Sequence, residues 1–386
     1  MKNKVYRWVF PAVLSLLLSG CVVPHKAVVV NKSIPETTRN ITLLLPLHGK
    51  LANESQAIHN GFLAAYYYDK QQTQADLNIK VTDVADGNII SIYQNAVGEN
   101  PDVIVGPLTK PMVAAVSDLP ITVPTIALNT LDNYSTKIVP NFYQFGLAPQ
   151  DEALQAADRI LADRHRQLVI MAPGNSWGQG LAKMFQHQYE NGGGNVIVDA
   201  EYNDQDNFDQ FTQKALDVVR TKIPDPTHKT SKVKLEITHR MDVDAIFLIA
   251  QPAITRQIVP LLRFYANDIP IYATSAIYSG TSNVILDQDI NGVFFCDMPW
   301  VLKNPLELSS QLQAIRNQII MLWPDFANYT KFYALGIDAY FLATSLGKLT
   351  RGEITTIDGA TGKLRLDQFN HIYRSLDWQR MGSGVF

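Results

Sequence analysis

The chain has 386 residues, of which 46% are hydrophobic and 18% charged, and its formal net charge is −3 at pH 7. This length can bury a large core and form more than one folded unit. The mildly acidic balance argues against the broad basic surface of proteins that bind nucleic acid or anionic membranes, so we expect no nucleic-acid partner.

The N-terminus predicts export and lipidation. Three positive residues precede an apolar run, from Trp8 to Leu18, that is too short to span a bilayer and has the length of a signal-peptide core. The run ends in Leu-Ser-Gly-Cys21, which resembles a bacterial lipobox, so we expect a signal peptide over residues 1–20 and lipidation of Cys21. Acyl chains contribute about 0.8 kcal/mol per buried CH₂ and would tether the chain. The alternative is that Cys21 is an ordinary thiol after a conventional cleavage site.

The residue after the cysteine predicts the compartment. Val22 stands where an Asp would act as an inner-membrane retention signal under the usual sorting rule, so we predict the periplasmic side of the outer membrane. Cleavage would remove three positive charges and shift the formal net charge to −6. Cys296 is the only other cysteine, so we expect no intramolecular disulfide. Residues 21–40 contain two prolines and no amphipathic period, and we predict a lipidated linker there.

From Ile41 onward, short apolar runs alternate with longer helical patterns, which is typical of βαβ units and parallel sheets. We predict a first series of strands over 41–47, 78–84, 103–106, 123–129 and 142–147. The spacing of Ile58, Phe62 and Ala65 predicts a helix over 54–68. A second helix is expected over 151–163, with Asp151 capping its first turn.

A second series of the same kind follows. Its predicted strands are 167–173, 194–202, 244–250 and 269–275, and its predicted helices are 180–190, 208–220 and 253–266. Two such series predict two α/β lobes. The last third adds the apolar segment 292–300, a helix ending near 346 and the closing segment 357–368.

A serine motif lies at the start of the second series. Gly174 to Gly178 fit G-x-S-x-G, the turn that presents a serine nucleophile in α/β-hydrolases. A triad would then need an acid followed by a histidine, and the only late histidine is His371. No glycine-rich loop precedes residue 174 to supply oxyanion donors. We therefore expect Ser176 to be a loop residue in a protein without catalytic residues, and a hydrolase remains the third hypothesis.

Three other features have a structural and a functional interpretation. The locally basic segment 221–240 is either a solvated insertion or a contact loop for an acidic partner. Asp242 and Asp244 resemble paired carboxylates, but we expect them to face solvent beside a strand. Trp300 and Trp323 are either binding aromatics or packing residues, and packing is the better default.

Metal and phosphate motifs are missing from the sequence. The eight histidines are scattered, without H-x-x-x-H or H-x-x-E-H spacing, and there is no C-x-x-C. Neither phosphate-binding glycine signature occurs. We expect no metal and no cofactor.

Several stretches together resemble the LpoA-type family of penicillin-binding protein activator lipoproteins. They run in order along about 340 residues and accompany the lipobox; they are residues 43–66, 105–113, 123–129, 145–157, 242–250, 270–275, 292–300, 333–340 and 359–367. The resemblance implies a type I periplasmic-binding-protein-like fold, an α/β architecture of two doubly wound parallel-sheet lobes joined by a three-strand hinge. Lobe 1 would take about 41–147 and 292–348, and lobe 2 about 148–291 and 349–386.

The resemblance also implies a function by contact. The family docks onto a class A penicillin-binding protein, a bifunctional peptidoglycan synthase, and stimulates peptidoglycan synthesis, without enzyme activity of its own. Longer members carry an N-terminal helical repeat domain, and here only the linker occupies that place. A stretched linker of about 65 Å and a domain of about 50 Å would reach on the order of 110 to 120 Å. Contact with a synthase through the wall would thus need an extended tether.

The competing hypothesis is a solute-binding receptor for an amino acid, amide or muropeptide-like ligand. Ligands of open α/β sheets lie beyond the carboxyl ends of the strands, which indicates Thr109, Asn129 and Ser275 as candidate cleft residues. Hydroxyl groups with backbone N–H groups could hold a ligand carboxylate, although "GPLTK" lacks the hydroxyl cluster usual in amino-acid receptors. A small-molecule ligand is therefore the alternative hypothesis to a partner protein.

Overall fold

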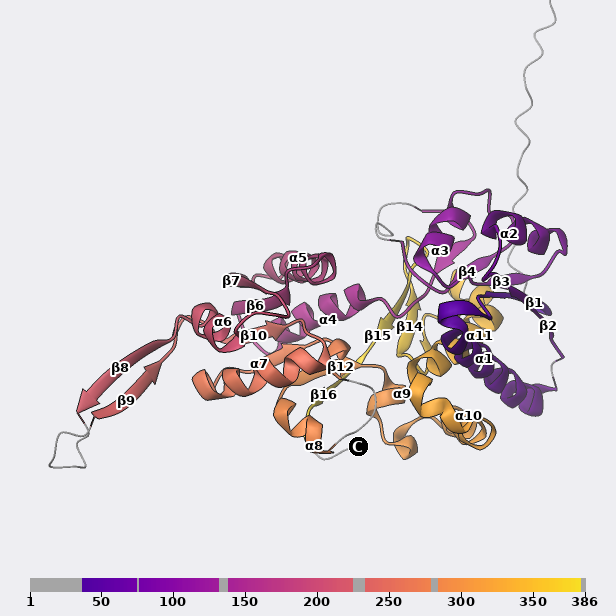
Figure 1. Ribbon diagram of the computed structural model, residues 1–386. Helices are drawn as coiled ribbons and strands as arrows, with labels where there is room; N and C mark the ends of the chain where they lie inside the picture. The colour runs from indigo at the N-terminus through magenta and orange to yellow at the C-terminus, as the bar shows by residue number, and fades with distance from the viewer. Residues whose placement is uncertain (1–36, 75, 132–137, 225–232, 279–283, 383–386) are drawn as a thin grey trace, which may run out of the picture. The chain divides into compact units, whose positions relative to one another are not determined.

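The computed structural model describes residues 37–74, 76–131, 138–224, 233–278 and 284–382 (Figure 1). The predicted signal peptide, Cys21 and most of the predicted linker lie outside the described residues. The described chain contains two parallel sheets with helices on both faces, as predicted for a doubly wound α/β fold.

The first sheet has five parallel strands in the order β2-β1-β3-β4-β5. Their bounds are β1 Asn40–Leu45, β2 Asn78–Asp83, β3 Val103–Val105, β4 Thr125–Ala127 and β5 Phe142–Gln144. The helices that accompany them are α1 Ala52–Thr73, α2 Ile89–Gly98, α3 Lys110–Ser117, α10 Ser310–Leu322 and α11 Thr330–Thr350. All five strands lie where the apolar runs predicted them, each shorter than expected at its carboxyl end.

The second sheet has six strands in the order β16-β12-β11-β10-β6-β7, and only the edge strand β16 is antiparallel. Its strands are β6 Gln167–Pro173, β7 Asn195–Tyr202, β10 Ala245–Leu248, β11 Ile271–Ala273, β12 Phe294–Asp297 and β16 Asp377–Arg380. Its helices are α4 Pro149–Ala162, α5 Ser176–Asn191, α6 Phe208–Ala215, α7 Pro252–Tyr265 and α8 Val284–Asp287. Helix α9 Pro299–Leu302 follows β12 and contributes Trp300 to the first core. Cys296 lies in β12 as a buried free thiol.

Both sheets are buried on both faces, because successive side chains of a strand point to opposite sides. In β1, Leu43 and Leu45 pack against α1 and α11, while Leu44 packs in a separate core with α2 and α3. In β6, Val169 and Ile170 enter different cores in the same way. This explains why the strands appear in the sequence as continuous apolar runs rather than as alternating patterns.

The chain passes between the two sheets three times, between β5 and α4, between β12 and α9, and between β15 (Ile372–Ser375) and β16. This agrees with the expected three-strand hinge, but the expected lobe bounds are wrong at two places. The strand at 294–297 pairs in the second sheet, so the chain leaves that sheet after Asp297 and not at about 292. Residues after 348 still pack on the first core, where Ala360, Leu364 and Ile372 are buried.

The chain stays on the first core after residue 348 because a small antiparallel sheet follows α11. Strands β13 Ile357–Asp358, β14 Lys363–Leu366 and β15 form an antiparallel unit, and their apolar side chains face α11 and its neighbours. Short strands with one buried face carry little periodic signal.

The predicted helix over 208–220 is also too long. Helix α6 ends at Ala215, and Asp217 adopts a left-handed conformation with φ of 49° that stops the helix. The chain then forms the antiparallel pair β8 (Val219–Pro224) and β9 (Val233–Thr238), which makes a two-stranded sheet of its own. In Figure 1 this β8–β9 hairpin is a ribbon separate from the six-stranded sheet. The described residues of the insertion predicted at 221–240 therefore lie mostly in these two paired strands.

Helices α1 and α11 cross at two glycines. A Cβ on Gly61 would overlap the carbonyl oxygen of Tyr333, and a Cβ on Gly336 would overlap that of Ile58. The two backbones touch at this crossing because neither glycine has a side chain. The predicted inward residues Ile58 and Phe62 are fully buried beside it.

Candidate functional site

Ser275, a predicted cleft residue, is bound by a carboxylate of the chain itself. It begins the short 3-10 helix η2 (Ser275–Ile277) just beyond the carboxyl end of β11. Its backbone N–H donates to Glu152 Oε2 at 2.8 Å, and its hydroxyl lies 3.0 Å from Glu152 Oε1. Glu152 comes from the first turn of α4, where the helix dipole favours an anion. The donors expected to hold a ligand carboxylate thus hold Glu152.

A second ion pair completes this group. Lys331, in the first turn of α11, places Nζ 2.8 Å from Asp297 Oδ2 and 3.2 Å from the hydroxyl oxygen of Ser275. Burial raises the pKa of Glu152, and the positive charge of Lys331 opposes that shift. An amino-acid ligand would offer one carboxylate and one ammonium group. Glu152 and Lys331 supply both groups from within the chain.

A second charged group lies where β15 meets the first sheet. His371, Arg374 and Asp151 are each at most 1% exposed, and His371 Nε2 lies 3.9 Å from Asp151 Oδ2. Burial raises the pKa of Asp151 to about 7, against the opposing charge of Arg374. Burial and then the same arginine lower the pKa of His371 to about 4. Near neutral pH the histidine is therefore neutral and the carboxyl titrates.

The position of Asp151 corrects a prediction. The N-cap of α4 is Ala148, and no side chain caps the helix. Both carboxylate oxygens of Asp151 are buried without a hydrogen-bond partner. Asp151 therefore lies in the first turn of α4 without capping the helix.

Asp338 organises the turn between β13 and β14. Its carboxylate accepts hydrogen bonds from the backbone N–H groups of Ala360 and Thr361 at 2.6 and 2.7 Å, and from the Thr361 hydroxyl at 2.6 Å. Burial raises its pKa to about 6, and these hydrogen bonds oppose the rise. All three donors belong to the chain itself, which indicates a structural role that connects α11 with the small sheet.

The other two cleft residues lie on the first sheet. Thr109 is the N-cap of α3, although its side chain makes no capping bond. Asn129 donates from Nδ2 to the carbonyl oxygen of Leu108 at 3.0 Å and accepts from the N–H of Thr130. Asn129 therefore lies beside the loop that contains Thr109. Among the described residues, no hydrogen bond connects either of them to Ser275.

Ser176 is the first residue of α5, exposed, and it follows the N-cap Asn175, whose side chain accepts from the N–H of Gly178. A Cβ on Gly178 would overlap the carbonyl oxygen of Pro173, so this glycine of the motif is needed for close packing of helix and strand. His371 lies in the buried group with Asp151. Within the described residues, no hydrogen bond joins Ser176 to a histidine.

The remaining candidates have structural positions. Asp242 is exposed and forms an ion pair with Arg240, as the solvent-facing interpretation predicted. Asp244 instead accepts hydrogen bonds from the backbone N–H groups that begin β6. Trp300 is fully buried in the first core, and Trp323 is partly buried against it. No group of described His, Cys, Asp or Glu side chains could hold a metal ion.

Sequence reasoning missed Glu152, Asp297, Lys331 and Arg374. Glu152 gave the only local signal, since it stands with Asp151 just after Pro149, a residue typical of the first turn of a helix. Its partners Ser275 and Lys331 lie more than a hundred residues away in the sequence. Only the pairing of distant segments brings them together.

The helices of the described residues include none with both the length and the apolar character to cross a bilayer.

Comparison with known proteins gives the family. The model of the family described as "LppC putative lipoprotein" matches residues 27–384. A curated relative from Vibrio vulnificus, named penicillin-binding protein activator LpoA, is 25% identical over 363 residues, which is 88% of this chain and 57% of that protein. The relative of the same name from Photobacterium profundum is 26% identical over 351 residues, 88% of this chain and 55% of that protein. The chain thus spans little more than half the length of these relatives.

Solved structures agree on the fold. The LpoA C-domain from Haemophilus influenzae, described as a regulator of PBP1A, superposes with a TM-score of 0.68 at 23% identity and covers 90% of this chain and 98% of that one. A protein from Rhodospirillum rubrum, described as a "putative branched-chain amino acid ABC transporter", superposes with a TM-score of 0.69 at 17% identity, covering 90% of this chain and 99% of that one.

These neighbours share the periplasmic-binding-protein-like architecture of two parallel-sheet halves. Because the family model covers nearly the whole chain in addition, the chain belongs to the LppC lipoprotein family, whose curated relatives are named penicillin-binding protein activators.

Proposed function

We propose that this chain is an outer-membrane lipoprotein, anchored at Cys21 on the periplasmic side, that binds and activates a class A penicillin-binding protein and so regulates peptidoglycan synthesis. In this proposal the chain performs no catalysis and acts through its surface. Relatives named as activators, matched over 88% of the chain, support the activity.

The observation that carries the proposal is the Glu152–Ser275–Lys331–Asp297 group. A solute receptor keeps hydrogen-bond donors available for its ligand at the ends of its strands. Here Glu152 accepts from both donors of Ser275, and Asp297 pairs with Lys331. A free amino acid would have to displace a buried carboxylate and break an ion pair, which costs several kcal/mol when a buried charge loses its partner. This supports a contact function over the receptor hypothesis.

The β8–β9 hairpin is the candidate contact surface for the partner. Segment 219–240 contains more basic than acidic residues, although the whole chain is acidic; its charged residues are Arg220, Lys222, Asp225, Lys229, Lys232, Lys234, Glu236 and Arg240. The hairpin pairs with no other strand among the described residues. A two-stranded ribbon of this kind has little stability alone and can be stabilised by a partner. A segment with this excess of basic residues fits an acidic patch on a synthase.

Activation is tested with the purified full chain in detergent and the cognate class A synthase. Glycan-strand polymerisation and peptide crosslinking should both be measured, and at least one rate should rise with the chain present. Lys222→Glu should weaken the activation. Lys348→Glu changes an exposed lysine of α11, which packs on the first core, and should leave the activation unchanged. No binding and no change in either rate would refute the proposal.

The anchor and the receptor hypothesis have separate tests. Mass spectrometry of the mature N-terminus should find acyl groups on Cys21, and globomycin should block processing. Any rise in melting temperature caused by amino acids or muropeptides should be the same in the unaltered chain and in Ser275→Ala, since Glu152 occupies Ser275. A clear stabilisation by a free amino acid, abolished in Ser275→Ala, would favour the receptor instead.

A further inference from the structure

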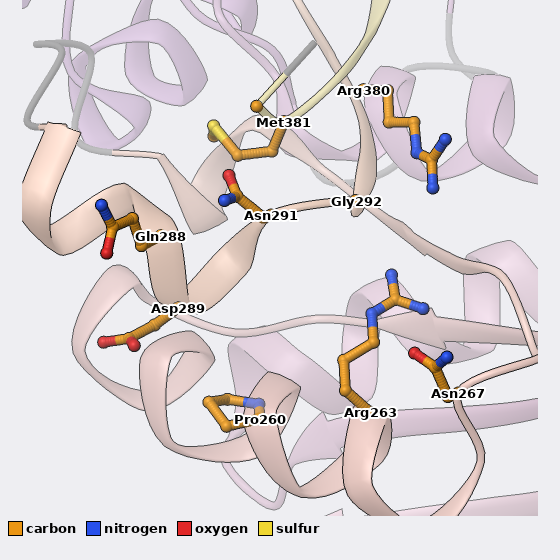
Figure 2. Close-up of a pocket in the computed structure, with 10 residues that line it drawn as sticks. Pro260, Arg263, Asn267, Gln288, Asp289, Asn291, Gly292, Arg380 and Met381 are labelled. Carbon is orange, nitrogen blue, oxygen red and sulfur yellow. The ribbon is translucent and has the colours of Figure 1, made fainter.

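A pocket with two arginines lies at the amino end of β12, at the opposite end of that strand from Asp297 (Figure 2). Its volume is about 760 Å³. The lining residues come from α7, from the segment around η3 (Gln288–Ile290) and from the end of β16. It therefore belongs to the second sheet alone and is separate from the Ser275 group.

The two guanidinium groups converge on one point. Arg263 Nη2 and Arg380 Nη2 lie 3.0 and 3.6 Å from the position that a Cβ would take on Gly292. Gly292 has a φ of 82°, a conformation that favours glycine, so this residue places no side chain between the arginines. In Figure 2 both guanidinium groups lie on the same side of the pocket as Gly292, and the Asp289 carboxylate lies on the other side.

Electrostatics favour an anion at this point. Two like charges held this close repel each other, and an anion between them would reverse the sign of the interaction. Burial, and then the charge of Arg380, lower the pKa of Arg263. No described carboxylate forms an ion pair with Arg263, and the guanidinium of Arg380 stacks 5.5 Å from the ring centre of Phe294, which orients its planar donors.

The rest of the pocket narrows the chemistry of the anion. Its volume lies within the range of sites for small organic ligands and is far larger than a single oxyanion needs. Side-chain amides of Asn267, Gln288 and Asn291 also line it, and an amide both donates and accepts, as a peptide group does. Arginine pairs are typical of carboxylate recognition, because the guanidinium fork matches the two oxygens.

We infer that this pocket binds a short peptide through its free C-terminal carboxylate, with the carboxylate between Arg263 and Arg380 and the peptide groups against the three amides. The site goes beyond the proposed activation of a synthase and does not depend on it. Two sources offer this chemistry in the periplasm: cell-wall peptides, which end in D-residues, and protein C-termini, which end in L-residues.

The test is calorimetric titration of the full chain in detergent at low salt, with four probes. These are N-acetyl-D-Ala-D-Ala, N-acetyl-L-Ala-L-Ala and the C-terminal carboxamide of each. We expect at least one of the two acids to bind, and we expect its carboxamide to bind with an affinity lower by about tenfold or more. A preference for the D-peptide assigns cell-wall peptides, and a preference for the L-peptide assigns protein C-termini.

Variants connect the binding to the arginines. Arg263→Gln and Arg380→Gln should each lower the affinity for the peptide acid by about tenfold or more. Arg263→Lys should recover only part of that affinity, because an ammonium group cannot bind both carboxylate oxygens as a guanidinium does. Arg365→Gln, an exposed arginine on β14, is the matched control and should bind normally. Arg380 is exposed at the end of an edge strand, so its variant should fold even if Arg263→Gln does not.

Three results would overturn the inference. They are equal binding of acid and carboxamide, unchanged binding in both glutamine variants, and no binding of either acid under conditions where the unaltered chain is folded by circular dichroism.

Discussion

The carboxylate of Glu152 accepts hydrogen bonds from both the backbone N–H and the hydroxyl of Ser275, which is 123 residues further along the chain. This contact holds the first turn of α4 to the end of β11. Lys331 of α11 also reaches the Ser275 hydroxyl, so segments that pack on both cores meet at one serine.

The first prediction concerns the stability of this contact. Ser275→Ala should lower the free energy of unfolding by about 1 to 2 kcal/mol, since the hydroxyl loses its hydrogen bonds with Glu152 and Lys331. Glu152→Gln should cost more, about 2 to 3 kcal/mol, because the buried amide has only one oxygen to accept from the two Ser275 donors and the partly buried Lys331 loses a nearby negative charge. Urea unfolding followed by circular dichroism measures both. Glu307→Gln, an exposed glutamate, is the control, and equal stability of Glu152→Gln and this control would contradict the prediction.

The second prediction concerns pH. The pKa of Asp151 is raised from 3.8 to about 7, so the folded state binds more protons than the unfolded chain between about pH 4 and 7. This residue therefore removes stability as the pH rises through that window. His371, with its pKa lowered from 6.5 to about 4, acts the other way and removes stability as the pH falls from 6.5 to 4.

Asp151→Asn should remove the loss of stability at rising pH and leave the contribution of His371 in place. Relative to the unaltered chain, the variant should gain about 3 kcal/mol of stability from pH 5 to pH 8, since a pKa of about 7 leaves about two pH units of titration in that range. Thermal unfolding at several pH values tests this. Asp158→Asn, on an exposed face of the same helix, should show no such gain, and a difference between Asp151→Asn and the unaltered chain that does not grow with pH would contradict the prediction.

The third prediction concerns the crossing of α1 and α11. Gly61→Ala should lower the free energy of unfolding by about 1 to 3 kcal/mol, because the new methyl group overlaps the backbone of Tyr333. Gly180→Ala is the matched control, since it lies in α5 with no atom within 4 Å of the new Cβ. That control should be neutral or should stabilise the chain by up to about 1 kcal/mol through helix propensity. Chemical unfolding of both variants in parallel measures the change in the free energy of unfolding, and a Gly61→Ala variant as stable as Gly180→Ala would contradict the prediction.

The fourth prediction concerns the base of the β8–β9 hairpin. Arg220 of β8 donates to the hydroxyl of Tyr265 in α7, and that hydroxyl donates to Asp209 of α6. Tyr265→Phe breaks both bonds and should make the hairpin open more often, at a cost of about 1 to 2 kcal/mol for two hydrogen bonds. Limited trypsin digestion should cleave within 219–238 faster than in the unaltered chain. Tyr67→Phe, on the surface of α1, should leave the cleavage rate unchanged.

The order of strands and helices could be predicted from the sequence, because each strand of a sheet buried on both faces is a continuous apolar run. Ile58 and Phe62 likewise predicted the buried face of α1, and both are fully buried. The hairpin at 219–238 could not be predicted, since α6 ends at a left-handed Asp217 rather than at a glycine or proline. The small sheet of β13 to β15 was missed because short, half-exposed strands leave no clear period.

By itself the sequence determined the family, the α/β class and the absence of metal-binding and phosphate-binding motifs, since these depend on local patterns and ordered stretches of residues. Only the tertiary structure decided what the candidate site residues touch. Ser275 was predicted as a ligand group from its place after a strand, and its partner Glu152 comes from another helix. Arg263 and Arg380 are separated by more than a hundred residues and meet at Gly292 because β16 returns to the edge of β12. Contacts of this kind depend on how distant segments pack, and no local pattern encodes them.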